Sequence, residues 1–134
     1  MIESPNLIET LDLIKVQNLE KMVLEDCLNL REIHPSTLVC NRLTLLNLKG
    51  YVNVKTLRRK FEMESLEVLI LFGCSKLKKI TEFGENLQHV LKLYFDETSI
   101  SKLPTSIVHL TNLFFFECKR LQKSYLFAKQ RFQF

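Results

Sequence analysis

Residues 66–80 read Leu66-Glu67-Val68-Leu69-Ile70-Leu71-Phe72-Gly73-Cys74-Ser75-Lys76-Leu77-Lys78-Lys79-Ile80, and the spacing of their apolar residues indicates the architecture of the chain. These apolar residues follow the frame L-x-x-L-x-L-x-x-C-x-x-L-x-x-I. The same frame starts at Leu19, Leu43 and Val90, and the four starts are separated by 24, 23 and 24 residues. A fifth start, Leu113, follows 23 residues later and then departs from the spacing. The chain is therefore built from an internal repeat.

The frame matches the leucine-rich repeat pattern, whose period is about 20 to 29 residues. Side chains alternate along a strand, so the two leucines of x-L-x-L-x point into a solenoid and the intervening residues point to its concave face. Each coil buries its apolar side only by stacking on a neighbouring coil. An amphipathic helix is the alternative for a leucine-rich period, but repeated L-x-L alternation breaks a 3.6-residue stripe.

We predict an α/β solenoid: a leucine-rich repeat arc with a parallel β-ribbon on the concave face and convex returns that are irregular, 3₁₀ or short-helical. The polar residues after Pro35 and Pro104 are expected to start a single 3₁₀ or helical turn. Neither end offers a recognisable polar cap, so we expect marginal stability. One domain is predicted over 1–134, with a partial repeat at 1–18, repeats at 19–42, 43–65, 66–89 and 90–112, and a degenerate repeat with a divergent tail at 113–134.

Composition indicates a folded, soluble chain. The 134 residues are 46% hydrophobic and 25% charged, with three Gly and three Pro, which excludes collagen-like and low-complexity classes. There is no window of 18 apolar residues, and the N-terminus lacks the basic-then-apolar plan of a secretory signal. We therefore expect a cytoplasmic or nuclear protein without a membrane partner.

No set of residues predicts catalysis or a metal site. The cysteines and histidines are scattered along the chain, at Cys27, Cys40, Cys74, Cys118, His34, His89 and His109. No two cysteines form a C-x-x-C pair. Cys27 and Cys74 share one repeat position two coils apart, or about 10 Å, whereas a disulfide needs Cα atoms within about 7 Å. We expect buried thiols, solvated or loop-bonded histidines, and no catalytic residue, cofactor or metal.

Basic residues fall into three clusters. They are Lys55, Arg58, Arg59 and Lys60; then Lys76, Lys78 and Lys79; and then Lys119, Arg120, Lys123, Lys129 and Arg131. If the first two clusters stack as neighbouring coils, they make a basic strip able to hold phosphates weakly. No recognition module accompanies them, and the net charge is only +4. A solvated face is favoured over anion binding, and no specific nucleic-acid partner is expected.

The concave face is predicted to bind a protein partner. Its twelve candidate residues form three columns along the stack: Lys21, Leu45, Val68 and Lys92; Val23, Asn47, Ile70 and Tyr94; and Glu25, Lys49, Phe72 and Asp96. The first two columns continue to Phe115 and Glu117 in the degenerate fifth repeat. A purely solvated ladder would be polar, yet these columns have an apolar centre and a charged rim. Such patches mark protein interfaces. The alternative is that the patch is covered within a longer protein or tolerated in a degraded fragment.

The amino-acid sequence within the repeats is as characteristic as their period. The stretches NLEKMVLEDC at 18–27, LREIHPS at 30–36, FEMESLEVLILFGCSKLKKI at 61–80, DET at 96–98 and LPTSI at 103–107 resemble the leucine-rich repeat region of plant disease-resistance receptors with TIR and nucleotide-binding domains. The resemblance implies intracellular immune surveillance, in which the repeats recognise a pathogen effector or guarded host protein and restrain the nucleotide-binding domain. Tyr51 departs from the Cys usual in that family. No G-x-x-x-x-G-K-[ST] loop or TIR segment is present to bind ATP or cleave NAD.

The sequence supports two functional hypotheses. The first is a non-enzymatic protein-binding module of a plant intracellular immune receptor, with a pathogen effector, a host guardee or the receptor's nucleotide-binding domain as partner. The alternative is a truncated regulatory or decoy fragment that docks onto a full-length receptor through the solenoid edges. The sequence leaves the identity of the partner and the oligomeric state open.

Overall fold

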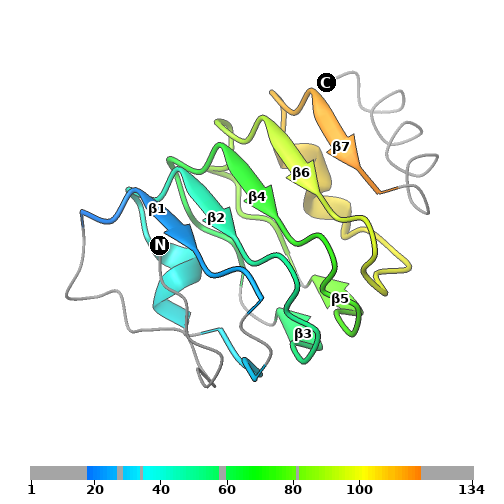
Figure 1. The fold of residues 1–134 in the computed structure, drawn as a ribbon. Helices are drawn as coiled ribbons and strands as arrows, with labels where there is room; N and C mark the ends of the chain where they lie inside the picture. Colours follow the sequence, from blue (N-terminus) through cyan, green and yellow to red (C-terminus); the bar gives the residue numbers. More distant parts are fainter. Residues whose placement is uncertain (1–17, 27–28, 34, 58–59, 81, 119–134) are drawn as a thin grey trace.

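The chain winds into a solenoid with five short parallel strands along one side (Figure 1). The computed structural model describes residues 18–26, 29–33, 35–57, 60–80 and 82–118. The strands of this ribbon pair in the order β1 (Lys21–Val23), β2 (Leu45–Asn47), β4 (Val68–Ile70), β6 (Lys92–Tyr94) and β7 (Phe115–Glu117). This architecture confirms the predicted leucine-rich solenoid with its parallel ribbon.

The repeat places its leucine positions in two interior rows. The first row is aligned by strand pairing and contains Met22, Leu46, Leu69, Leu93 and Phe116. The second row contains Leu24, Leu48, Leu71 and Phe95, and all residues of both rows are buried. Backbone bonds continue the ladder beyond the strands, as from the Leu48 N–H to the Ile70 carbonyl at 2.8 Å. Burying one such side chain stabilises the fold by about 1.5–3 kcal/mol, so the rows supply the main driving force.

A tight turn follows each of the first four ribbon strands, and one residue in every turn has a left-handed backbone. These residues are Asp26 (φ 57°), Gly50 (φ 82°), Gly73 (φ 77°) and Glu97 (φ 59°). They recur at the period of the repeat, so the conformation belongs to the coil and not to one loop. Glycine adopts a positive φ without strain, whereas a residue with a Cβ rarely does. Two of the four turns therefore have an unfavourable residue.

The next position is buried in the second, third and fourth coils, where it is occupied by Tyr51, Cys74 and Thr98. The Cys74 thiol donates to the Leu48 carbonyl of the preceding coil at 3.2 Å. Desolvation by burial raises the pKa of this thiol to about 11, against the opposing effect of a backbone hydrogen bond from Tyr51. Thr98 takes the position in the fourth coil, where its hydroxyl donates to the Phe95 carbonyl at 2.9 Å. Thiol, phenol ring and hydroxyl thus fill equivalent places between coils.

The convex returns are of two kinds. The first coil forms the predicted 3₁₀ turn η1 (Pro35–Val39), and the fourth coil forms η2 (Thr105–His109) directly after Pro104. In the second and third coils the chain is extended, and β3 (Thr56–Leu57) pairs in parallel with β5 (Lys79–Ile80). The repeat pattern does not predict this second ribbon, because strands of two residues have no alternation to detect.

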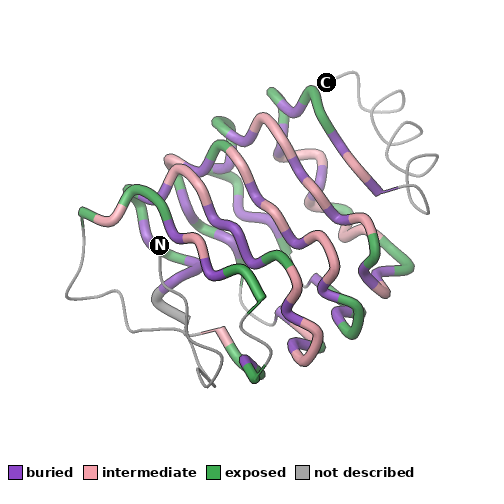
Figure 2. The backbone as a smooth tube through the Cα atoms, in the orientation of Figure 1, coloured by how far each residue is buried: buried purple, intermediate pink, exposed green. Residues whose placement is uncertain are grey.

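One apolar core runs through the coils, as the buried residues of Figure 2 show. Side chains from the returns complete it, including Leu30, Leu57, Leu77 and Ile80. The predicted repeat boundaries stay predictions. The segment before residue 18, the tail after Cys118, Cys27, His34, Arg58 and Arg59 lie outside the described residues.

Candidate protein-binding face

Strand pairing aligns eight of the twelve candidate residues in two columns, and backbone bonds beyond the strands align the other four in a third. Lys21, Leu45, Val68 and Lys92 are paired across β1, β2, β4 and β6. Val23, Asn47, Ile70 and Tyr94 are paired in the same way two residues further along. Glu25, Lys49, Phe72 and Asp96 are brought side by side by backbone bonds, such as that from the Gly50 N–H to the Phe72 carbonyl at 2.9 Å.

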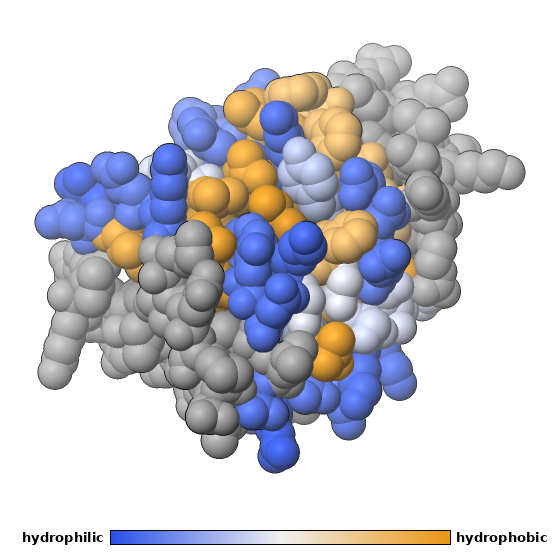
Figure 3. Space-filling view, in the orientation of Figure 1, coloured by the Kyte–Doolittle hydropathy of each residue, from blue (hydrophilic) through white to orange (hydrophobic). Residues whose placement is uncertain are grey.

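Six apolar side chains form the centre of this face, and we call them the concave patch. They are Val23, Leu45, Val68, Ile70, Phe72 and Tyr94, and every one is partly exposed. Figure 3 shows hydrophobic residues gathered over β2 and β4 with hydrophilic residues around them. The third coil contributes three consecutive outward positions to the patch. Because these side chains share one strand and its turn, they present a continuous apolar surface.

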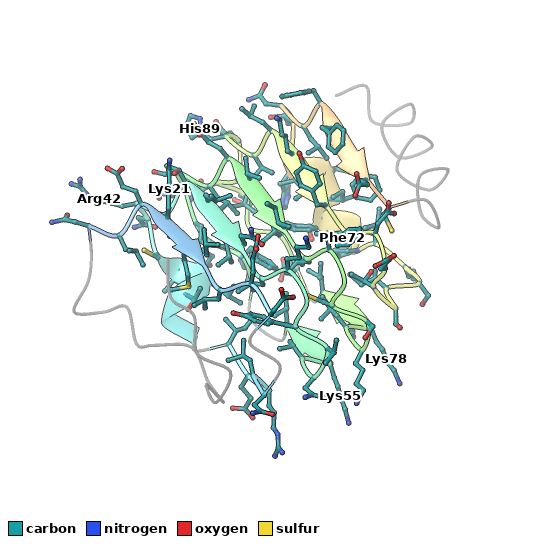
Figure 4. The ribbon with its side chains drawn as sticks, viewed as in Figure 1. Lys21, Arg42, Lys55, Phe72, Lys78 and His89 are labelled. Atoms are coloured by element: carbon teal, nitrogen blue, oxygen red, sulfur yellow. The ribbon has the colours of Figure 1, made fainter. Side chains whose placement is uncertain are left out.

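Lysine amines stand over aromatic rings at the rim of the patch. The Lys49 Nζ lies 5.8 Å from the centre of the Phe72 ring, which Figure 4 labels at the end of β4. The Lys92 Nζ lies 5.9 Å from the centre of the Phe114 ring. An ammonium over a ring face is attracted by the ring quadrupole, by about 0.5–1 kcal/mol at an exposed site. These contacts place positive charge against the aromatic rings at the rim of the patch.

Asn47 differs from the other candidate residues because its side chain is nearly inaccessible. It is 8% exposed. Its amide nitrogen donates to the Glu25 Oε1 at 2.8 Å, and its amide oxygen accepts from the Lys49 N–H at 3.0 Å. Asn47 therefore links the first coil to the second and offers little surface to a partner. Period alone could not distinguish this structural amide from a surface residue.

The aromatic surface extends beyond the twelve residues onto β7. Phe114 is 67% exposed and Phe115 is 38% exposed. The Phe115 ring lies 5.0 Å from that of Tyr94, so it adjoins the concave patch. Phe114 lies beside it and under the Lys92 amine. The sequence placed Phe115 in the column of Lys92, as strand pairing confirms, whereas Phe114 was not predicted to be part of this surface.

Reactive side chains do not converge on this face. Cys40 and Cys74 are buried, His89 is exposed, and the His109 Nδ1 lies 3.0 Å from the Phe83 carbonyl in a loop contact. Within the described ranges, no three His, Cys, Asp or Glu side chains are placed to hold a metal ion. Over the same ranges no helix has the length and apolar character needed to cross a membrane.

A polar hollow of about 500 Å³ lies between the returns, away from the concave patch. Its lining includes Glu62, Glu64 and Glu85, with one lysine, Lys60, whose Nζ lies 3.8 Å from the Glu62 carboxylate. Both members of this ion pair are well exposed, so the pair contributes little to stability. Nothing in the hollow combines a nucleophile with a base.

The ribbon, the interior leucine rows and the bonded Cys position define the chain as a leucine-rich repeat protein. It is 35% identical over 123 residues to disease resistance protein RPP2A of Arabidopsis thaliana, covering 90% of this chain and 9% of that protein. It is 37% identical over 98 residues to disease resistance-like protein DSC1 of the same plant, covering 72% and 8%. It is 32% identical over 124 residues to TMV resistance protein N of Nicotiana glutinosa, covering 88% and 11%.

The chain therefore belongs to the leucine-rich repeat regions of plant disease-resistance proteins, as the sequence of its repeats predicted. It spans about a tenth of the length of these curated relatives. No family profile matches the chain, and no solved structure matches it. The relatives support a defence-related receptor role.

Proposed function

We propose that the chain is a non-catalytic, protein-binding module of a plant intracellular immune receptor, located in the cytoplasm or nucleus, and that the concave patch is its contact surface. The partner is a pathogen effector, a guarded host protein or the receptor's own nucleotide-binding domain. The observation that carries the proposal is the partly exposed apolar row Val68, Ile70 and Phe72 at the centre of a ribbon whose rim is charged. Apolar centres with polar rims are the usual anatomy of protein interfaces.

The shape of the surface favours a protein over a small molecule. The patch is spread over four coils, from Val23 on β1 to Tyr94 on β6. Small-molecule sites are instead concave pockets with a few convergent polar groups. Cys40, Cys74 and Cys118 are buried, and burial raises the pKa of the Cys74 thiol to about 11, so it is protonated at neutral pH. A broad contact with another protein is the function that this arrangement supports best.

The proposal is tested by placing charge in the patch. The double variant Ile70→Asp and Phe72→Asp is immobilised beside the unchanged chain, and proteins captured from plant extract are compared by mass spectrometry. The matched control is Val39→Asp, which introduces the same kind of charge at a 38% exposed apolar residue of η1. We expect the proteins captured by the unchanged chain to be lost from the double variant and kept by Val39→Asp.

Identical capture by all three chains contradicts the proposal. Far-UV circular dichroism verifies that each variant is folded. Since aspartates at two half-buried positions can weaken the coil, the milder change Phe72→Gln is measured in parallel. It retains part of the side-chain volume while removing the aromatic surface, and we expect it to reduce capture in the same direction.

The second candidate function is docking onto a full-length receptor through the end of the solenoid, as a regulatory or decoy fragment. The exposure of Phe114, at 67%, on the last described coil favours it. Under this alternative, Phe114→Asp abolishes binding to the receptor, while the double change at Ile70 and Phe72 leaves it intact. The opposite pattern supports the concave patch.

A further inference from the structure

Four lysines gather on the solenoid edge that is formed by β3 and β5, and we call them the basic edge. The Lys78 N–H bonds to the Lys55 carbonyl at 2.8 Å, so these residues occupy neighbouring coils. Lys79 pairs with Thr56, and Lys76 lies in the turn before β5. All four lysines are exposed. Figure 4 shows Lys55 and Lys78 extending away from the two strands on the same side.

The charge of the basic edge is not neutralised locally. Segments 52–57 and 75–80 contain these four lysines and no Asp or Glu. Among the residues placed by the structure, no carboxylate lies within salt-bridge distance of their amines, and the Lys76 Nζ donates a hydrogen bond to the uncharged Asn53 side chain at 3.3 Å. Neighbouring strands are about 4.8 Å apart, which brings like charges close together. Lys102 precedes Leu103 as Lys79 precedes Ile80, so the next coil adds a lysine at the equivalent position.

We propose that the basic edge binds an acidic segment of a partner protein. A row of close amines without internal counter-ions attracts a row of carboxylates, and such complementarity gives specificity and a fast encounter. Lysine suits this role because its ammonium is a point charge on a flexible stem and adapts to irregularly spaced acids. The proposal concerns β3 and β5, whereas the concave patch lies on the other ribbon, so the two sites are independent.

Other anions fit the basic edge less well. Proteins that bind single-stranded nucleic acid alternate cations with aromatic platforms for the bases, and segments 52–57 and 75–80 contain no aromatic residue. Peripheral membrane binding combines cations with exposed apolar side chains that enter the bilayer. The large apolar residues exposed in the described part of the chain are Val39, Phe114 and Phe115, which lie on η1 and beside or in β7. The edge thus offers charge alone.

The test uses the full chain and a fluorescein-labelled oligoglutamate peptide, with binding followed by fluorescence polarisation. The double variant Lys55→Glu and Lys78→Glu reverses two charges on the basic edge. The matched control Arg42→Glu and Lys60→Glu reverses two exposed charges that lie outside both the basic edge and the concave face, and it gives the same net charge. We expect binding at least about ten-fold weaker for the edge variant and within about two-fold for the control, because like-charge juxtaposition acts over short range.

Three results overturn the proposal. One is no binding of oligoglutamate by the unchanged chain at low ionic strength. Another is an equal loss of affinity in the edge and control variants, which assigns the effect to net charge. The third is tighter binding, sensitive to the edge variant, of an oligothymidylate of equal charge or of phosphatidylserine vesicles. None of these results bears on capture through Ile70 and Phe72, so the two proposals fail separately.

Discussion

Gly73 offers a clean measurement of what the left-handed turn costs. Its φ is +77°. A Cβ built there comes no nearer than 3.6 Å to the Gly50 backbone nitrogen, which is ordinary contact. Gly73→Ala therefore adds strain without a clash. The left-handed conformation destabilises a residue with a Cβ by about 1–2 kcal/mol. Alanine also lowers the conformational entropy of the unfolded chain, which offsets about 0.4–1 kcal/mol of that loss. The net expectation is a destabilisation of about 0.5–1 kcal/mol.

Glu97 provides the reciprocal change, since it occupies the same turn position with φ 59°. The same two terms enter with opposite sign, so Glu97→Gly is expected to stabilise the chain by about 0.5–1 kcal/mol. Both variants are measured by urea unfolding followed by circular dichroism, with the midpoint compared at unchanged slope. If φ at position 73 were negative, alanine would instead stabilise the chain by reducing unfolded-state entropy. A higher midpoint for Gly73→Ala therefore refutes the reasoning.

Three further predictions concern packing, hydrogen bonding and pH. Gly84→Ala places a Cβ 2.5 Å from the Phe61 carbonyl oxygen, and this overlap should lower the free energy of unfolding by about 2 kcal/mol. The variant should therefore unfold at a lower urea concentration than the unchanged chain. Asn47→Ala removes the amide that bonds to Glu25 and should cost about 1–2 kcal/mol without loss of the strand signal; an unchanged midpoint contradicts the linking role. Burial raises the pKa of the Cys74 thiol from 9.0 to about 11, so as the pH rises the unfolded chain loses this proton before the folded chain does. The free energy of unfolding is therefore unaffected by this thiol below about pH 9 and falls by up to about 2 kcal/mol as the pH approaches 11. In Cys74→Ala the free energy of unfolding should fall less over this pH range, and an equal fall in both chains disproves the role of Cys74.

Period and alternation were sufficient to predict the ribbon and the pairing of its columns. A repeat of 23 or 24 residues fixes which side chains are neighbours on adjacent coils, as with Val68 beside Leu45. A one-residue slip would turn the leucine rows outward, so the register has no low-energy alternative. The 3₁₀ turns were likewise predictable, because Pro35 and Pro104 pre-set the backbone at their start.

Features that depend on side-chain contact were beyond sequence reasoning. The pattern x-L-x-L-x makes Asn47 an outward residue, yet its two hydrogen bonds draw it inward until it is 8% exposed. The pairing of β3 with β5 depends on two coils being extended at the same place, a property of neighbouring coils together. The exposure of Phe114 depends on the packing around the fifth coil, where the repeat spacing no longer holds. The binding role of the concave patch stays a proposal, because a surface identifies no partner by itself.

The second ribbon has a consequence for how firmly two coils are held together. Paired parallel strands lie about 4.8 Å apart, and the second and third coils are paired twice, through β2 with β4 and through β3 with β5. Sliding or opening between these two coils would have to break both sets of backbone bonds. The third coil, which carries Ile70 and Phe72, is therefore anchored to its neighbour at two places along its path.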